Sequence, residues 1–102
     1  MYYTDLEDLT DLVSDVLENM GMDDFNFEVP TYDEVMKSGM GYLFVTVYIP
    51  YRAVKADAEE LAFDLERAVN LQVYEKVEVT VDDYGQAQVT LCVKTEPVVS
   101  YD

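Results

Sequence analysis

Histidine and tryptophan are absent from this 102-residue sequence, and cysteine occurs once, as Cys92. Without histidine the chain cannot build an imidazole acid–base or metal site. A lone cysteine cannot close an internal disulfide, so a reducing cytosol is the expected setting. Tyrosine, by contrast, is frequent, with nine residues, and it is a favoured residue at protein–protein interfaces.

Basic residues are also scarce: six Lys and Arg face 22 Asp and Glu, for a net charge of −16. The first base is Lys37, and eleven acids precede it: Asp5, Glu7, Asp8, Asp11, Asp15, Glu18, Asp23, Asp24, Glu28, Asp33 and Glu34. The remaining residues carry the other eleven acids and all six bases, so the net charge divides as −11 and −5. Such a charge repels nucleic acid and anionic lipid, and it attracts basic proteins in a salt-dependent way. The sequence therefore predicts a basic protein as the partner and excludes direct binding of nucleic acid.

Long apolar runs and catalytic motifs are missing as well. The longest strongly apolar run, Tyr42–Ile49, is too short to span a bilayer, and no basic-plus-apolar signal segment begins the sequence. There is no glycine-rich phosphate loop and no calcium loop, and Cys92 has no histidine to activate it. We therefore expect a cytoplasmic protein, in a host cytosol, that is not an enzyme and uses neither a cofactor nor a metal.

Half of the residues are apolar, which suffices for a single domain over residues 1–102. Helical periodicity predicts helices over about Asp5–Met20 and Ala53–Val69. Alternating apolar residues predict four strands, at Phe25–Val29, Tyr42–Ile49, Val73–Val81 and Gln86–Thr95. Residues 96–102 are expected to form a short tail.

Local signals mark the ends of these elements. Thr4 and Glu7 have the form of a capping box, and Gly21 is expected to end the first helix. Asn70 is expected to end the second helix in a left-handed conformation. Two four-residue segments complete the pattern: a single helical turn beginning at Thr31–Glu34, and a hairpin turn at Asp82–Gly85 in which Gly85 takes a positive φ.

The predicted fold class is α+β, with the order α-β-β-α-β-β. The simplest packing is a four-stranded, mainly antiparallel sheet with both helices on one face. The strand residues expected in the core are Leu43, Val45, Val47, Ile49, Val73, Val77, Val79, Val81, Ala87, Val89, Leu91 and Val93. The opposite sheet face is expected to show Tyr42, Phe44, Tyr48, Tyr74, Lys76, Glu78, Gln88, Thr90 and Lys94, together with Cys92.

Four carboxylates of the first helix recur at i, i+3, i+7 and i+10 and form a stripe away from the leucines: Asp8, Asp11, Asp15 and Glu18. They step by about 4.5–6 Å along the helix axis. This is coarser than duplex DNA, which carries about one charge per 1.7 Å. Imitation of a duplex would need a second acidic segment alongside, and the candidates are Asp23, Asp24, Asp33 and Glu34.

A solvated helix face is the alternative interpretation of this stripe. Five like-charge pairs on the first helix each cost about 0.2–0.5 kcal/mol at low salt, and the helix dipole offsets this cost only near the N-terminus. A merely solvated face usually includes lysines. Both interpretations stay open. The acids of the second helix have basic residues beside them and are interpreted as a solvated face.

The aromatic residues Tyr42, Phe44 and Tyr48 form a second candidate contact surface, because Tyr and Phe bury much area with few rotatable bonds. The alternative is that they pack beneath the segment 31–41 or the C-terminal tail. We favour that alternative for Phe44 and leave Tyr42 and Tyr48 open.

The base-free run Asp5–Glu34 and the tyrosines beside it make the chain resemble small acidic phage-type DNA-mimic inhibitors, including anti-CRISPR and anti-restriction proteins, in charge and size. The resemblance implies a protein that occupies the basic nucleic-acid-binding surface of a partner, for example a CRISPR effector or a restriction enzyme. The predicted partner-binding residues are Asp8, Asp11, Asp15, Glu18, Asp23, Asp24, Asp33, Glu34, Tyr42 and Tyr48.

Two other hypotheses remain. One is a structural or adaptor module of a phage or mobile element that grips its partner through the aromatic sheet face or an exposed strand edge. The other is a halophilic protein whose acidity is an adaptation to its solvent. An even spread of acids would favour the halophile, and the division into −11 and −5 argues against it.

Overall fold

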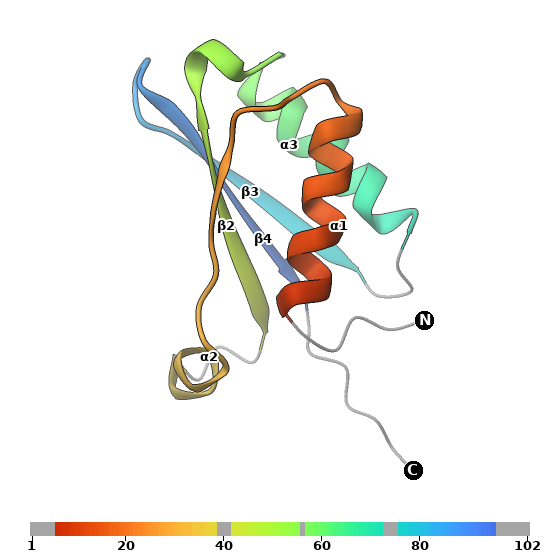
Figure 1. Cartoon of the computed structure of the whole chain (residues 1–102), viewed down its shortest axis with the longest axis vertical. Coiled ribbons are helices and arrows are strands. Elements are labelled where there is room, and N and C mark those ends of the chain that lie inside the picture. The colour runs from red at the N-terminus through yellow and green to blue at the C-terminus, as the bar shows by residue number, and fades with distance from the viewer. Residues whose placement is uncertain (1–5, 39–41, 56, 73–75, 96–102) are drawn as a thin grey trace.

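A computed structural model describes residues 6–38, 42–55, 57–72 and 76–95 of the chain (Figure 1). The elements in chain order are α1 (Leu6–Asn19), β1 (Asn26–Glu28), α2 (Tyr32–Ser38), β2 (Leu43–Pro50), the 3-10 turn η1 (Tyr51–Ala53), α3 (Ala58–Asn70), β3 (Val77–Asp83) and β4 (Gln88–Thr95). The predicted α+β class is confirmed. The expected N-cap Thr4, the strand residues Val73 and Tyr74 and the tail 96–102 lie outside the described residues.

The four strands form one antiparallel sheet in the order β1-β2-β4-β3. β2 and β3 run parallel to each other with β4 between them, so α3 is the crossover that joins them. Phe27, Val47, Leu91 and Val81 lie opposite one another in a row across all four strands. Because side chains alternate between faces, this register points the apolar set of every strand toward the same side.

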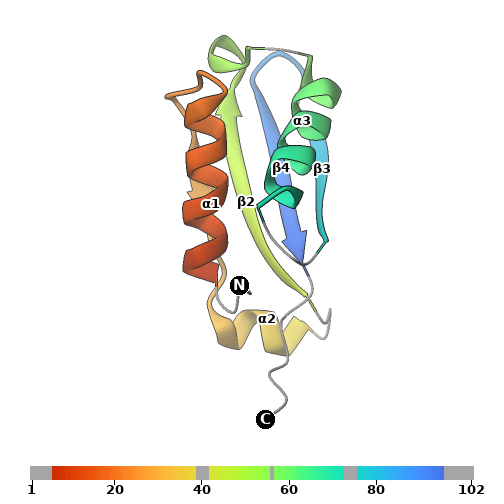
Figure 2. The ribbon, with the colours of Figure 1, turned by 90° about the vertical axis from the view of Figure 1, so that its right-hand side faces the viewer.

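The core lies between that side of the sheet and the two long helices. α1 packs over β2 and α3 over β3, and Figure 2 shows the two helices side by side in front of the sheet. The helix residues buried there are Leu6, Leu9, Leu12, Val13, Val16, Leu17, Leu61, Ala62, Leu65 and Val69. Each large side chain buried this way stabilises the fold by about 1.5–3 kcal/mol relative to exposure. Met22, which is fully buried in the loop after α1, was not among the predicted core residues.

α3 begins five residues later than predicted, at Ala58 instead of Ala53. Asp57 is its N-cap: the carboxylate accepts a hydrogen bond from the backbone N–H of Glu59 at 3.0 Å. Upstream of it, Tyr51–Ala53 form a 3-10 turn. Capping by a carboxylate satisfies a backbone donor that the first turn leaves free, and this fixes the helix start more firmly than the apolar spacing of Val54 and Ala58 does.

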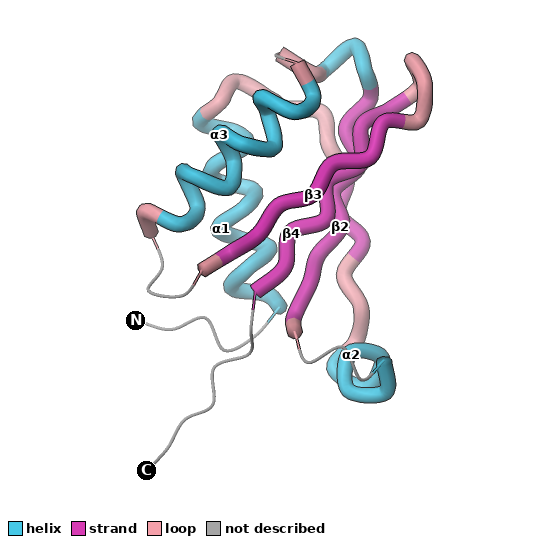
Figure 3. The backbone as a smooth tube through the Cα atoms, turned by 180° about the vertical axis from the view of Figure 1, so that it is seen from behind, coloured by secondary structure: helices cyan, strands magenta, loops and turns pink. Residues whose placement is uncertain are grey.

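Asn70 does not adopt the predicted left-handed conformation, since no described residue other than glycine has a positive φ. It is the last residue of α3, and its side chain binds the outer edge of β3. Its Oδ1 accepts from the N–H of Val77 at 2.6 Å, and its Nδ2 donates to the carbonyl of the same residue at 3.0 Å. Glu66 accepts from the N–H of Val79 at 3.4 Å. The side chains of α3 therefore cover part of an edge strand that would otherwise be open to pairing. Figure 3 shows the backbones of α3 and β3 next to each other.

The turn between β3 and β4 falls two residues later than predicted. Asp82 and Asp83 pair within the sheet, and the loop runs over residues 84–87, closed by a 3.1 Å bond from the N–H of Tyr84 to the carbonyl of Gln88. Ala87 is consequently exposed in this loop, and its predicted place in the core is wrong. Gly85 has the predicted positive φ, at +69°, and Gly21, which was predicted to end the first helix, lies just after α1 with φ +89°.

α2 is longer than the single turn expected from its capping signal, because it covers seven residues. The Thr31 hydroxyl accepts from the N–H of Glu34 and donates to the Glu34 carboxylate, both at 3.2 Å. Val35 is buried and ties the helix to the core cluster. α2 lies beyond the end of the sheet at which β2 starts (Figures 1 and 2).

Candidate functional site

The outer face of α1 is acidic, as the sequence predicts. Asp8, Asp11, Asp15 and Glu18 are all exposed, and they lie on the side of the helix away from its six buried residues. The helical period of 3.6 residues explains this arrangement. Apolar residues that recur with this period form one buried face, so the residues between them face the solvent. We call these four residues the acidic stripe.

The acidic stripe is about 15 Å long, given ten steps of about 1.5 Å. One strand of duplex DNA carries about one charge per 3.4 Å of helix axis, so it places between about four and five charges over that length, and the two strands together place about nine. Four carboxylates therefore approach the charge density of a single phosphate row. α1 contains no Lys or Arg to reduce it.

The second acidic segment extends this surface without filling its gaps. Asp23 and Asp24 lie in the loop just after α1, while Asp33 and Glu34 lie in the first turn of α2. In both views α2 lies beyond the opposite end of α1 (Figures 1 and 2). Asp23 and Asp24 therefore follow the stripe at one end, whereas Asp33 and Glu34 lie beyond its other end on a helix that Figure 1 places toward the sheet side of the molecule, so neither pair makes the stripe denser.

Two of these end-placed acids already have partners within the chain. Asp24 forms an ion pair with Arg52 of η1, with 3.0 Å between Oδ2 and Nη2. Glu34 takes part in the cap of α2 described above. Exposed ion pairs contribute little to stability, typically under about 1 kcal/mol, so the bond to Arg52 is one that a basic partner could replace.

The outer sheet face carries the predicted aromatic residues. The rings of Tyr42 and Phe44 meet edge to face at 6.0 Å, and Lys94 Nζ lies 5.1 Å from the centre of the Tyr42 ring. Lys94 also pairs with Glu78 at 3.6 Å. Phe44 is half-buried and packs against the core cluster. Part of the surface of Tyr42 and of Phe44 is therefore in contact with other residues of the protein and is less available to a partner.

Tyr48 belongs to the same face and is held by the edge strand. Its hydroxyl donates to the Glu28 carboxylate of β1 at 2.5 Å. This hydrogen bond, which requires the protonated phenol, raises the pKa of Tyr48 above its usual value, and partial burial and the Glu28 charge act in the same direction. Glu28 therefore faces the outer side of the sheet, away from the acidic stripe.

Cys92 lies on this face between Thr46 and Thr80 in the strand register and is half-buried. Burial raises the pKa of its thiol, and the nearby Lys94 only partly opposes that shift. A thiol with a raised pKa is a poor nucleophile. Within the described part of the chain, no group of three or more Cys, Asp or Glu side chains is arranged to hold a metal ion. No helix in that part is both long and apolar enough to cross a membrane.

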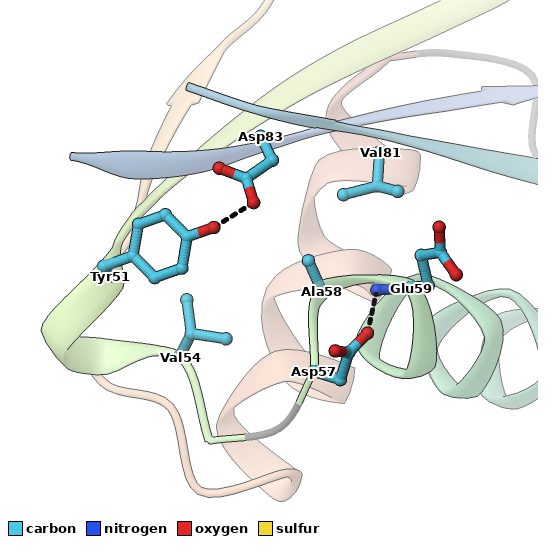
Figure 4. A pocket seen from close by; sticks show the side chains of 7 residues that line it. All are labelled: Tyr51, Val54, Asp57, Ala58, Glu59, Val81 and Asp83. Carbon is cyan, nitrogen blue, oxygen red and sulfur yellow. Dashed lines mark hydrogen bonds between the residues drawn. The ribbon is translucent and has the colours of Figure 1, made fainter. Parts of the chain in front are cut away.

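Two exposed features escaped the sequence predictions. Phe63 of α3 is 65% exposed, and a half-open pocket of about 510 Å³ lies between η1, the start of α3 and the end of β3. Its lining residues are Tyr51, Val54, Asp57, Ala58, Glu59, Val81 and Asp83 (Figure 4). The exposure of Phe63 could have been predicted from the sequence, because Phe63 does not lie on the apolar face of its helix. The pocket could not have been predicted, because three separate elements form it.

The chain was compared with protein-family models, with curated proteins and with solved structures, and none of the three comparisons found a match. The surfaces described above are therefore the basis for assigning a function.

Proposed function

We propose that this protein is a non-enzymatic acidic binding protein that occupies the basic nucleic-acid-binding surface of a partner protein, as DNA-mimic inhibitors do. The observation that carries the proposal is the acidic stripe: four exposed carboxylates on the outer face of α1, with no base on that helix. An ordinary solvated face would mix lysines among them.

The geometry of α1 supports the imitation of one phosphate row. The helix is held by six buried residues on its inner face, so the carboxylates are presented at fixed spacing before binding. A preorganised row loses little side-chain and backbone freedom when a partner binds. Arg and Lys of a nucleic-acid-binding groove would meet these carboxylates in charge-assisted hydrogen bonds, which are stronger than neutral ones.

The proposed partner is a basic nucleic-acid enzyme such as a CRISPR effector or a restriction enzyme. Competition for its groove would block nucleic-acid loading without chemistry, cofactor or metal from this chain. Such a partner works in the cytosol of a host cell, where the single thiol of Cys92 would remain reduced.

Neutralising the acidic stripe tests the proposal. The variant Asp8→Asn, Asp11→Asn, Asp15→Asn, Glu18→Gln changes the net charge from −16 to −12. The control variant Glu60→Gln, Asp64→Asn, Glu78→Gln, Asp82→Asn makes the same change on exposed residues of α3 and β3. We expect the wild type and the control to displace labelled duplex DNA from a CRISPR effector or a restriction enzyme, and the stripe variant to fail.

Salt gives a second test. Direct binding of the wild type to the same partner, measured without competing DNA, should weaken steeply between about 50 and 200 mM salt, since the proposed contacts are ionic. Equal displacement by the stripe variant and the wild type, or loss in both variants alike, would rule out the stripe as the binding surface.

The adaptor hypothesis has one observation in its favour: α1 and α3 both lie on the other side of the sheet, so neither covers the outer sheet face (Figure 2). If that face grips the partner, Tyr42→Ala with Tyr48→Ala should weaken binding more than the stripe variant does, with little dependence on salt.

A further inference from the structure

We propose that the pocket at the start of α3 receives an arginine side chain from the basic partner, so that the chain holds its partner at a second place besides the acidic stripe. The inference rests on the proposed function for the nature of the partner. Its site uses none of the four stripe residues, and it can therefore be tested separately.

The walls of the pocket are partly apolar. Val54 follows η1, Ala58 opens α3 and Val81 comes from β3, and each is half-buried. Tyr51 closes one side, where its hydroxyl donates to the Asp83 carboxylate. Figure 4 shows the side chains of Val81 and Asp83 facing those of Ala58 and Val54 across the hollow. Such walls suit the aliphatic stem of a long basic side chain, which buries its methylenes and keeps its charge at the polar end.

The rest of the lining is acidic: Asp57, Glu59 and Asp83 contribute three carboxylates, and none of the seven lining residues is basic. The Asp57 carboxylate already occupies the N-terminus of α3, through its bond to the N–H of Glu59, so the helix dipole has its anion. The charge of the pocket therefore favours a cation. A planar guanidinium with five donors can meet carboxylates on different sides, which an ammonium does less well.

The pocket also lies where the protection of the β3 edge ends. Side chains of α3 bind the backbone N–H of Val77 and of Val79, and the lining of the pocket begins at the next residue of the same alternation, Val81. One turn along α3 from Glu59, Phe63 is exposed. Aromatic residues are enriched at protein interfaces, and Phe63 offers the partner an apolar contact one helical turn from Glu59.

The test uses the full chain and a defined probe, the capped peptide acetyl-Gly-Arg-Gly-amide, followed by backbone amide NMR shifts. The matched peptide with citrulline in place of arginine keeps the shape of the side chain and removes its charge. The matched peptide with lysine keeps the charge and removes the planar, five-donor guanidinium group. We expect the arginine peptide to shift the amides of Glu59, Val81 and Asp83 saturably, the lysine peptide to bind more weakly, and the citrulline peptide to leave them unchanged.

Two variants with equal charge separate the pocket from general acidity. Glu59→Gln with Asp83→Asn should weaken binding of the arginine peptide by about tenfold or more, because charge-assisted hydrogen bonds are lost. Glu60→Gln with Asp64→Asn, on the same helix outside the pocket, should leave it unchanged. Shifts spread over the whole acidic surface, or equal binding by both variants, would overturn the proposal.

The outcomes distinguish this inference from the proposed function. Peptide binding at the pocket, together with unaltered DNA displacement by the stripe variant, would support the arginine-binding pocket and contradict the proposed role of the acidic stripe. Loss of displacement in the stripe variant, without saturable peptide binding, would support the stripe and contradict the pocket.

Discussion

Among single residues, Asn70 has a role that depends on its side chain alone. It makes two hydrogen bonds to the backbone of Val77 in a part-buried setting. Asn70→Ala leaves that N–H and carbonyl without their partner, and we expect a loss of about 1–3 kcal/mol in the free energy of unfolding, measured by urea denaturation. Asn19→Ala is the matched control, because Asn19 is also the last residue of its helix but is exposed. Equal losses in the two variants would show that the bonds to Val77 contribute nothing specific.

The hydrogen bond between Tyr48 and Glu28 gives a pH-dependent prediction. Because this bond raises the pKa of Tyr48, the stabilisation it provides is fully present below the unfolded value of about 10 and is lost as pH rises through the folded value. Glu28→Gln keeps an acceptor but removes its charge. Absorbance titration of the phenols should show one tyrosine ionising at lower pH in this variant than in the wild type. An unchanged titration curve would contradict the assignment.

Sequence signals identified residues whose role is local and missed those whose role depends on a distant element. Gly21 and Gly85 were predicted correctly, because a positive φ at the end of a helix or in a hairpin is a local requirement. The role of Asn70 was not predicted, because it depends on where β3 docks. Asp57 was missed because the apolar spacing of Val54 and Ala58 suggested an earlier helix start.

At the scale of elements, the acidic stripe that we propose as the binding surface lowers the stability of α1. Asp15 and Glu18 repel each other and lie near the end of α1 where the helix dipole disfavours negative charge. Asp15→Asn with Glu18→Gln should therefore raise the free energy of unfolding by roughly 0.5–1.5 kcal/mol at low salt. Glu7→Gln, in the first turn where the dipole favours a carboxylate, should give no gain. A stability gain that accompanies a loss of binding would indicate that the stripe is kept for its function.

The candidate surfaces differ in how far the sequence could predict them. The exposure of the acidic stripe was predictable, because the leucine face of α1 determines which side meets solvent. The place of Asp33 and Glu34 was not, since it depends on how β1 and α2 return along the sheet. The pocket joins side chains from Tyr51 to Asp83, and no periodicity within one element encodes such a meeting.

For the whole molecule, the net charge of −16 makes stability depend on ionic strength. Salt screens repulsion between exposed charges over a Debye length of about 10 Å at 0.1 M. We expect the melting temperature to rise as NaCl increases from about 0.01 to 0.5 M, by roughly 4–8 °C for each kcal/mol of repulsion removed. Scanning calorimetry or near-UV circular dichroism would measure this rise.

The two variants with four charges neutralised show where that repulsion resides. Both have a net charge of −12, reached by removing four charges from −16, so a rise governed by net charge alone would shrink equally in both. If the repulsion is concentrated on α1, the stripe variant should melt higher at low salt and gain less from added salt than the control variant. The second outcome is expected, because the stripe contains three successive like-charge pairs one turn apart on a helix without bases. The control positions contain one such pair, Glu60 and Asp64, and Glu78 is already paired with Lys94.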